Sequence, residues 1–283
     1  MSFASLSRGS AVVMLAAATA ATAFAGRPQA VTRPGYDADA RTVEMFAGIE
    51  DGSLDVRLVM RDETAGNLFV NNLTDEPLNV EIPKAYVGVH VFEQIGGGGF
   101  GGGGGGIGGG GQGGGGQGVG GGGGIGGGGG IGGGGGVGGA GGGGGFFSIP
   151  PEQFARVPFR SVCLEHGKID PNPKMTYRVR RVEEFTSNPA LRELIEMVAE
   201  GRAGGQPAQA AAWHLSDGMS WAELAAKEVR HVGGRPPTRY FTQRDLNVGV
   251  AAARAAAVRA RAEAEKAPSE PRTPVETNPR LRD

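Results

Sequence analysis

The sequence predicts an α+β fold, in which an antiparallel β-sandwich is interrupted by a disordered poly-glycine loop and followed by a C-terminal helical part. Three observations lead to this prediction. Short runs of alternating apolar and polar residues recur between turn-forming residues across 42–95 and 146–185. All but nine of the 50 residues from 96 to 145 are glycine. Apolar residues at helical spacing then occupy the region 186–266.

The β region divides into short strands that are bounded by turn-forming residues. Pro158 lacks the amide hydrogen that a central strand needs, so we expect its strand at an edge or a bulge. The strand-turn-strand pattern of 71–80 resembles that of immunoglobulin-like sandwiches in secreted bacterial proteins, and this resemblance implies an immunoglobulin-like topology. The expected strands are Leu54–Met60, Asn67–Asn71, Leu78–Ile82, Tyr86–Phe92, Phe154–Leu164 and Met175–Val182.

Helix-capping residues mark the starts of the helices that we expect after the sandwich. Asn188 followed by Pro189 is a favourable helix start. Ser220 and Glu223 have the spacing of a capping box for a later helix. Together with the apolar spacing, these signals predict helices that begin near 189, 207, 221 and 243, the last of which extends to about 266.

Both ends of the chain are expected to lie outside the folded part. Residues 1–25 contain one basic residue, an apolar run and the ending Ala23-Phe24-Ala25, a combination that is typical of a secretory signal peptide. We therefore expect an exported protein of the periplasm, the cell surface or the extracellular space. Residues 26–41 are expected to form a flexible lead-in and 267–283 a disordered tail. No later apolar stretch has the length of a membrane span, so we expect none after signal cleavage.

The glycine tract is expected to be disordered because glycine loses more backbone entropy on ordering than any other residue. Closing so long a loop costs only about 2 kcal/mol more than closing a short turn, so the sandwich can accommodate it. From Val119 to Val137 the aliphatic residues recur every six positions. A glycine helix with three residues per turn would place them on one face. The tract is therefore either a permissive surface loop or a segment through which copies of the chain associate.

The charge balance and the scarcity of catalytic motifs exclude several classes of function. A formal net charge of −1 argues against nucleic-acid binding, which needs a basic surface. The spacing of a zinc site is absent among Cys163, Glu165, His166 and His214. The sequence also has no nucleophile-elbow motif. We expect no metal and no cofactor. The favoured interpretation is a secreted, non-enzymatic structural or interaction protein whose partner is an unknown protein or surface polymer.

One pair of residues suggests a specific chemistry. Cys163 is the only cysteine, and Gln209 begins the segment Gln-Ala-Ala-Ala-Trp. This segment resembles the glutamine motif of thioester domains in bacterial surface adhesins, although Val162 stands where that family has an aromatic residue before the cysteine. The resemblance implies a thioester between Cys163 and Gln209 that reacts with amines on another surface. The alternative is that Cys163 is a buried apolar residue and that Gln209 is solvated or caps a backbone amide.

Two tryptophans follow on successive expected helices. Trp213 and Trp221 are either core residues or an aromatic binding face. The last helix is rich in arginine, but it also carries Asp245, Glu263 and Glu265. We therefore interpret it as a solvated face rather than as a binder of anionic surfaces.

Overall fold

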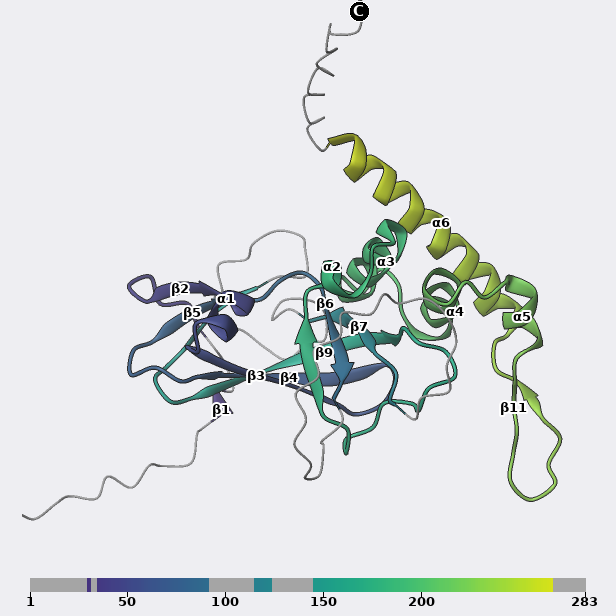
Figure 1. Ribbon diagram of the computed structural model, residues 1–283, viewed down its shortest axis with the longest axis horizontal. Coiled ribbons are helices and arrows are strands. Elements are labelled where there is room, and N and C mark those ends of the chain that lie inside the picture. Colours follow the sequence, from purple (N-terminus) through teal and green to yellow (C-terminus); the bar gives the residue numbers. More distant parts are fainter. Residues whose placement is uncertain (1–29, 32–34, 92–114, 124–144, 267–283) are drawn as a thin grey trace, which may run out of the picture.

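A closed six-stranded antiparallel β-barrel forms the centre of the protein in the computed structural model, which describes residues 30–31, 35–91, 115–123 and 145–266 (Figure 1). In the order in which they pair around the ring, the barrel strands are β9 (Phe154–Cys163), β4 (Ala65–Asn72), β3 (Leu54–Met60), β10 (Tyr177–Arg180), β6 (Tyr86–His90) and β7 (Val119–Gly122). Strand β7 pairs with β9 and so closes the ring. A short strand, β1 (Ala30–Val31), adds to β9 in parallel.

The predicted immunoglobulin-like sandwich is wrong, because the sheet closes on itself. The expected strands form, but β7 pairs with β6 on one side and with β9 on the other, so the main sheet is not split into two layers. The strand that closes the ring comes from the glycine tract, which was expected to be a disordered loop. Pro158 lies opposite Asn67 of β4, and on its other side β9 is paired with β1 only at Phe154–Ala155 and with β7 only from Arg160 onward. The proline is therefore at a local gap in the pairing of β9, which agrees with the expected edge position.

Strand β7 fits into the barrel because its glycines have no side chains. A Cβ atom on Gly121 would lie 1.8 Å from the carbonyl oxygen of Arg160, far inside van der Waals contact. Helix α3 (Pro189–Ala199) packs against the same strand, and its Ile195 would lie 2.9 Å from a Cβ on Gly120. Val119, the one residue of β7 with a side chain, is fully buried in the barrel core and is not available for self-association through the tract.

A small three-stranded sheet lies beside the barrel and shares its core. It consists of β2 (Arg41–Glu44), β5 (Leu78–Glu81) and β8 (Phe146–Ile149), and α1 (Met45–Glu50) follows β2 directly. Parts of the expected lead-in, 26–41, therefore contribute β1 and the first residue of β2. The signal peptide expected at 1–25, the tail expected at 267–283 and most of the glycine tract lie outside the described residues.

The remaining helices lie together along one side of the barrel (Figure 1). Besides α3 they are α2 (Val182–Phe185), α4 (Gly205–Ser216), α5 (Trp221–Ala226) and α6 (Gln243–Lys266). The predicted starts are confirmed within two residues. The side chain of Asn188 accepts hydrogen bonds from the first turn of α3, and Ser220 and Glu223 form the predicted capping box. None of the helices described is both long and apolar enough to cross a membrane.

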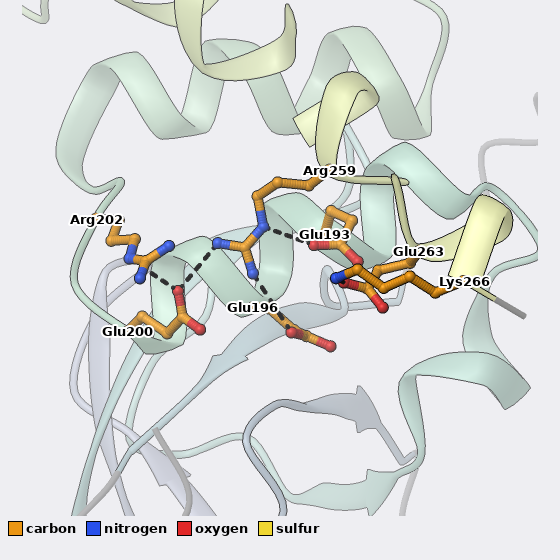
Figure 2. A network of polar contacts seen from close by, with 7 residues as sticks. All are labelled: Glu193, Glu196, Glu200, Arg202, Arg259, Glu263 and Lys266. Atoms are coloured by element: carbon orange, nitrogen blue, oxygen red, sulfur yellow. Dashed lines mark hydrogen bonds and ion pairs between the residues drawn. The ribbon is translucent and has the colours of Figure 1, made fainter. Parts of the chain in front are cut away.

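Arg259 fastens α6 to α3 through a network of carboxylates (Figure 2). Its guanidinium lies 2.7 Å from Glu193, 3.2 Å from Glu200 and 3.7 Å from Glu196. Burial, together with the charge of Glu193, raises the pKa of Glu196. The sequence predicted a solvated face for this arginine-rich helix. The structure shows instead that part of α6 is packed against other helices. The buried residues of α6 include Ala253, Ala256 and Ala260.

Candidate functional site

The side chain of Gln209 on α4 contacts the backbone of Cys163, the last residue of β9. Its Oε1 accepts a hydrogen bond from the backbone N–H of Cys163 at 2.8 Å, and its Nε2 donates to the carbonyl oxygen of Cys163 at 2.9 Å. Both residues are buried, with 1% and 5% of their surface exposed. The two residues singled out from the sequence, 46 positions apart, are therefore in direct contact.

The position of Gln209 follows from the way in which the barrel ends. Strand β4 is paired with β9 only as far as Arg160, and beyond it the N–H of Ser161 bonds to the carbonyl oxygen of Thr64. The next backbone groups on that side of β9 belong to Cys163. They are buried, and an unpaired buried amide costs about 1–3 kcal/mol. The carboxamide of Gln209 takes the place of the missing strand and pairs both groups.

The sulfur atom lies in a buried cluster between the barrel and the helices. Burial, with added repulsion from Asp170 and Glu63, raises the pKa of the Cys163 thiol well above its usual range. The two hydrogen bonds join the carboxamide of Gln209 to the N–H and the C=O of the same residue, Cys163. The carboxamide carbon therefore lies opposite the backbone of Cys163. The other residues of this cluster are Ala210, Trp213, Leu224, Phe241 and Leu246.

The two tryptophans do not form a common exposed face. Trp213 is 3% exposed and packs beside Cys163, and its indole N–H has no hydrogen-bond partner among the described residues. Trp221 is partly buried at the margin of the cluster, and its ring lies 4.5 Å from that of His214. In this conformation Trp213 belongs to the core, next to the candidate thioester pair.

A basic side chain from the segment after α5 covers the outer side of Trp213. The Nζ atom of Lys227 lies 5.1 Å from the ring centroid of Trp213 and 5.0 Å from that of Tyr240. It also lies 2.8 Å from Nε2 of His166. Burial lowers the pKa of Lys227, and burial together with the charge of Lys227 lowers the pKa of His166. No sequence signal pointed to Lys227, because these four residues come from different segments and share no motif.

Away from Cys163 and Gln209, the described residues form an open pocket but no cluster that could hold a metal ion. No three histidine, cysteine, aspartate or glutamate side chains within 30–31, 35–91, 115–123 and 145–266 come together to hold a metal ion. An open pocket beside β6 and β10 carries charges of both signs, and its Lys168 is ion-paired with Glu165. The pocket also includes His90, Arg180 and Glu184.

Comparisons of the chain with protein families, with curated proteins and with solved structures find no match.

Proposed function

We propose that the chain is an exported attachment protein in which the side chains of Cys163 and Gln209 form an internal thioester. The observation that carries the proposal is the buried contact between the Gln209 carboxamide and Cys163. These contacts hold the carboxamide against the backbone of Cys163, so the thiol on the same residue is kept near it, and such positioning replaces a bimolecular encounter.

The reaction balances without an outside reagent. The Cys163 sulfur bonds to the carboxamide carbon of Gln209, the carbon–nitrogen bond of the amide breaks, and the thiol proton leaves with the nitrogen as ammonia. The carboxamide must first turn from the backbone of Cys163 toward its sulfur. The near-complete burial of both residues keeps water from the thioester once it has formed.

Capture of a partner reverses the first step with a different amine. A primary amine adds to the thioester carbonyl, an amide bond forms between the amine and the Gln209 side chain, and Cys163 is released as a thiol. Each molecule reacts once, so the protein acts as an attachment device and not as an enzyme. The signal peptide expected at 1–25 would deliver it to a compartment where amine-bearing surface proteins and polymers are present.

A second candidate function is a non-covalent structural or interaction role. The observation that favours it is that Gln209 pairs the backbone of Cys163 and not its sulfur. In that case Gln209 only completes the end of β9. The high pKa of the thiol fits an inert, buried cysteine.

The intact mass of the mature protein distinguishes the two functions. We expect the purified chain to be lighter than its sequence by one ammonia, and incubation with methylamine to add one methylamine. Cys163→Ala and Gln209→Ala should each show the full sequence mass and no addition. A wild-type chain with its full mass, no methylamine addition and one titratable thiol after unfolding would refute the thioester.

A further inference from the structure

The ammonium group of Lys227 lies in a small site made of rings. The Trp213 and Tyr240 rings face it at 5.1 and 5.0 Å, within the range of cation–π attraction, and His166 lies at hydrogen-bond distance. Among the described residues no carboxylate is close enough to form an ion pair with Lys227, although Asp170 acts on it from further away. The rings and one imidazole therefore replace the carboxylate that usually holds a lysine.

This group of rings adjoins the candidate thioester pair. Trp213 packs beside Cys163 in the same buried cluster, while its ring also supports the ammonium of Lys227. His166 is three residues beyond Cys163, and its ring meets that of Trp213 edge-on at 4.7 Å. Trp213 therefore contacts the ammonium of Lys227 and also belongs to the cluster that contains Cys163.

We propose that His166, Trp213 and Tyr240 form a binding site for a lysine-type primary amine, and that Lys227 occupies this amine site as a resident competitor. That the bound amine attacks the thioester rests on the proposed function. That an amine binds at this site does not depend on it. The rings favour the ammonium form as it arrives. The pKa of His166 is lowered by burial and by the charge of Lys227, and its Nε2 lies at hydrogen-bond distance from the ammonium. In the reaction this imidazole takes one proton from the ammonium, which leaves the neutral amine as the nucleophile and the imidazole as imidazolium.

The position of Lys227 makes its displacement feasible. It directly follows α5 and precedes the β11–β12 hairpin (β11, Glu228–Val229; β12, Thr238–Arg239), which projects away from the body of the protein (Figure 1). All residues from 228 to 239 are exposed. Lys227 can therefore leave the amine site by a change of side-chain rotamer, while its backbone carbonyl stays hydrogen-bonded to the N–H of Tyr240.

A binding experiment tests the amine site without using the thioester. In a Cys163→Ala background, which cannot react, n-butylammonium is titrated while the fluorescence of Trp213 and Trp221 is recorded. We expect Lys227→Ala to bind the probe at least about tenfold more tightly than the Cys163→Ala parent, because the resident amine is gone. Lys174→Ala, which removes an exposed lysine of the same charge, should behave like the parent.

Equal affinity of the parent and Lys227→Ala for the probe would overturn the proposal, as would equal gains for Lys227→Ala and Lys174→Ala. Adding Tyr240→Leu to Lys227→Ala should abolish most of the gain. Circular dichroism establishes that each variant is folded, and Lys227→Ser provides a second small replacement. If the wild-type chain has its full mass while Lys227→Ala binds butylammonium, the proposed function fails and the amine site stands. If the thioester forms but Lys227→Ala shows no added binding, the amine site fails alone.

Discussion

Replacing Gly121 by alanine tests whether the glycine tract closes the barrel. Gly121 pairs with Ser161 in the ladder between β7 and β9. A Cβ atom at this position would lie 1.8 Å from the carbonyl oxygen of Arg160, whereas ordinary contacts of this kind begin at 3.4 Å. The obstructing atom belongs to the backbone of a central strand, so no side-chain rotation can relieve the clash.

The structure sets the size of the expected effect. Relieving the clash requires β7 and β9 to separate locally by about 1.6 Å, the difference between the two distances, which stretches the neighbouring hydrogen bonds beyond their usual length. Two weakened ladder bonds cost about 0.5–1.5 kcal/mol each, and overpacking against β9 adds about 1–3 kcal/mol. We therefore expect Gly121→Ala to lower the free energy of unfolding by about 2–6 kcal/mol.

Urea unfolding followed by circular dichroism measures this loss. Gly35→Ala is the matched control, because a Cβ on Gly35 meets no atom within 4 Å. The control should change the free energy of unfolding by less than about 0.5 kcal/mol. If both variants unfold at the same urea concentration with the same slope, β7 does not close the barrel and the account of the glycine tract is wrong.

Three further substitutions test the site and the helices, each by urea unfolding. In a Cys163→Ala background, in which no thioester can form, Gln209→Ala leaves the buried backbone N–H and carbonyl groups of residue 163 unpaired and should lower the free energy of unfolding by about 2–4 kcal/mol; a loss below about 1 kcal/mol would show that water replaces the side chain. Asn188→Ala removes the cap of α3 and should cost about 1–2 kcal/mol, whereas no loss would mean that the cap is dispensable. Arg259→Met removes the counter-charge of three partly buried carboxylates and should cost about 1–3 kcal/mol. Because the pKa of Glu196 is raised, this carboxylate is among the first to take up a proton as the pH falls from neutral. The decrease in the free energy of unfolding caused by Arg259→Met should therefore become smaller at lower pH. A decrease that becomes larger at lower pH would contradict the network.

The helical part was predictable because its signals are local. The cap at Asn188 and the capping box of Ser220 and Glu223 act within one helical turn, and the helices begin where these residues predict. The network around Arg259 was not predictable, because its carboxylates lie on a different helix. The sequence pattern shows which face of a helix is apolar, but it does not show which charged residues will meet.

The barrel escaped prediction because its closing strand carries almost no pattern. Strand prediction depends on alternating side chains, and β7 has only Val119 followed by glycines. A glycine-rich segment normally gains too little from burial to offset its loss of entropy. Here the fit of β7 between two strands and α3 supplies contacts that the composition does not reveal. The remaining strands are compatible with either a sandwich or a barrel, and only the pairing of β7 with β9 distinguishes them.

In the candidate site, too, a sequence motif predicted one part, and only the folded structure shows the other. The Gln209 motif pointed to Cys163 across 46 residues, because the proposed thioester requires one cysteine and one glutamine side chain. The amine site has no such constraint: rings that surround an ammonium are ordinary aromatic residues in sequence, and Lys227 is an ordinary surface lysine. What distinguishes it is its place beside Trp213 without a carboxylate partner in the described residues. In this site the ammonium of Lys227 loses part of its hydration and gains rings and an imidazole in place of an ion pair. The same rings and imidazole can bind the ammonium of an incoming amine.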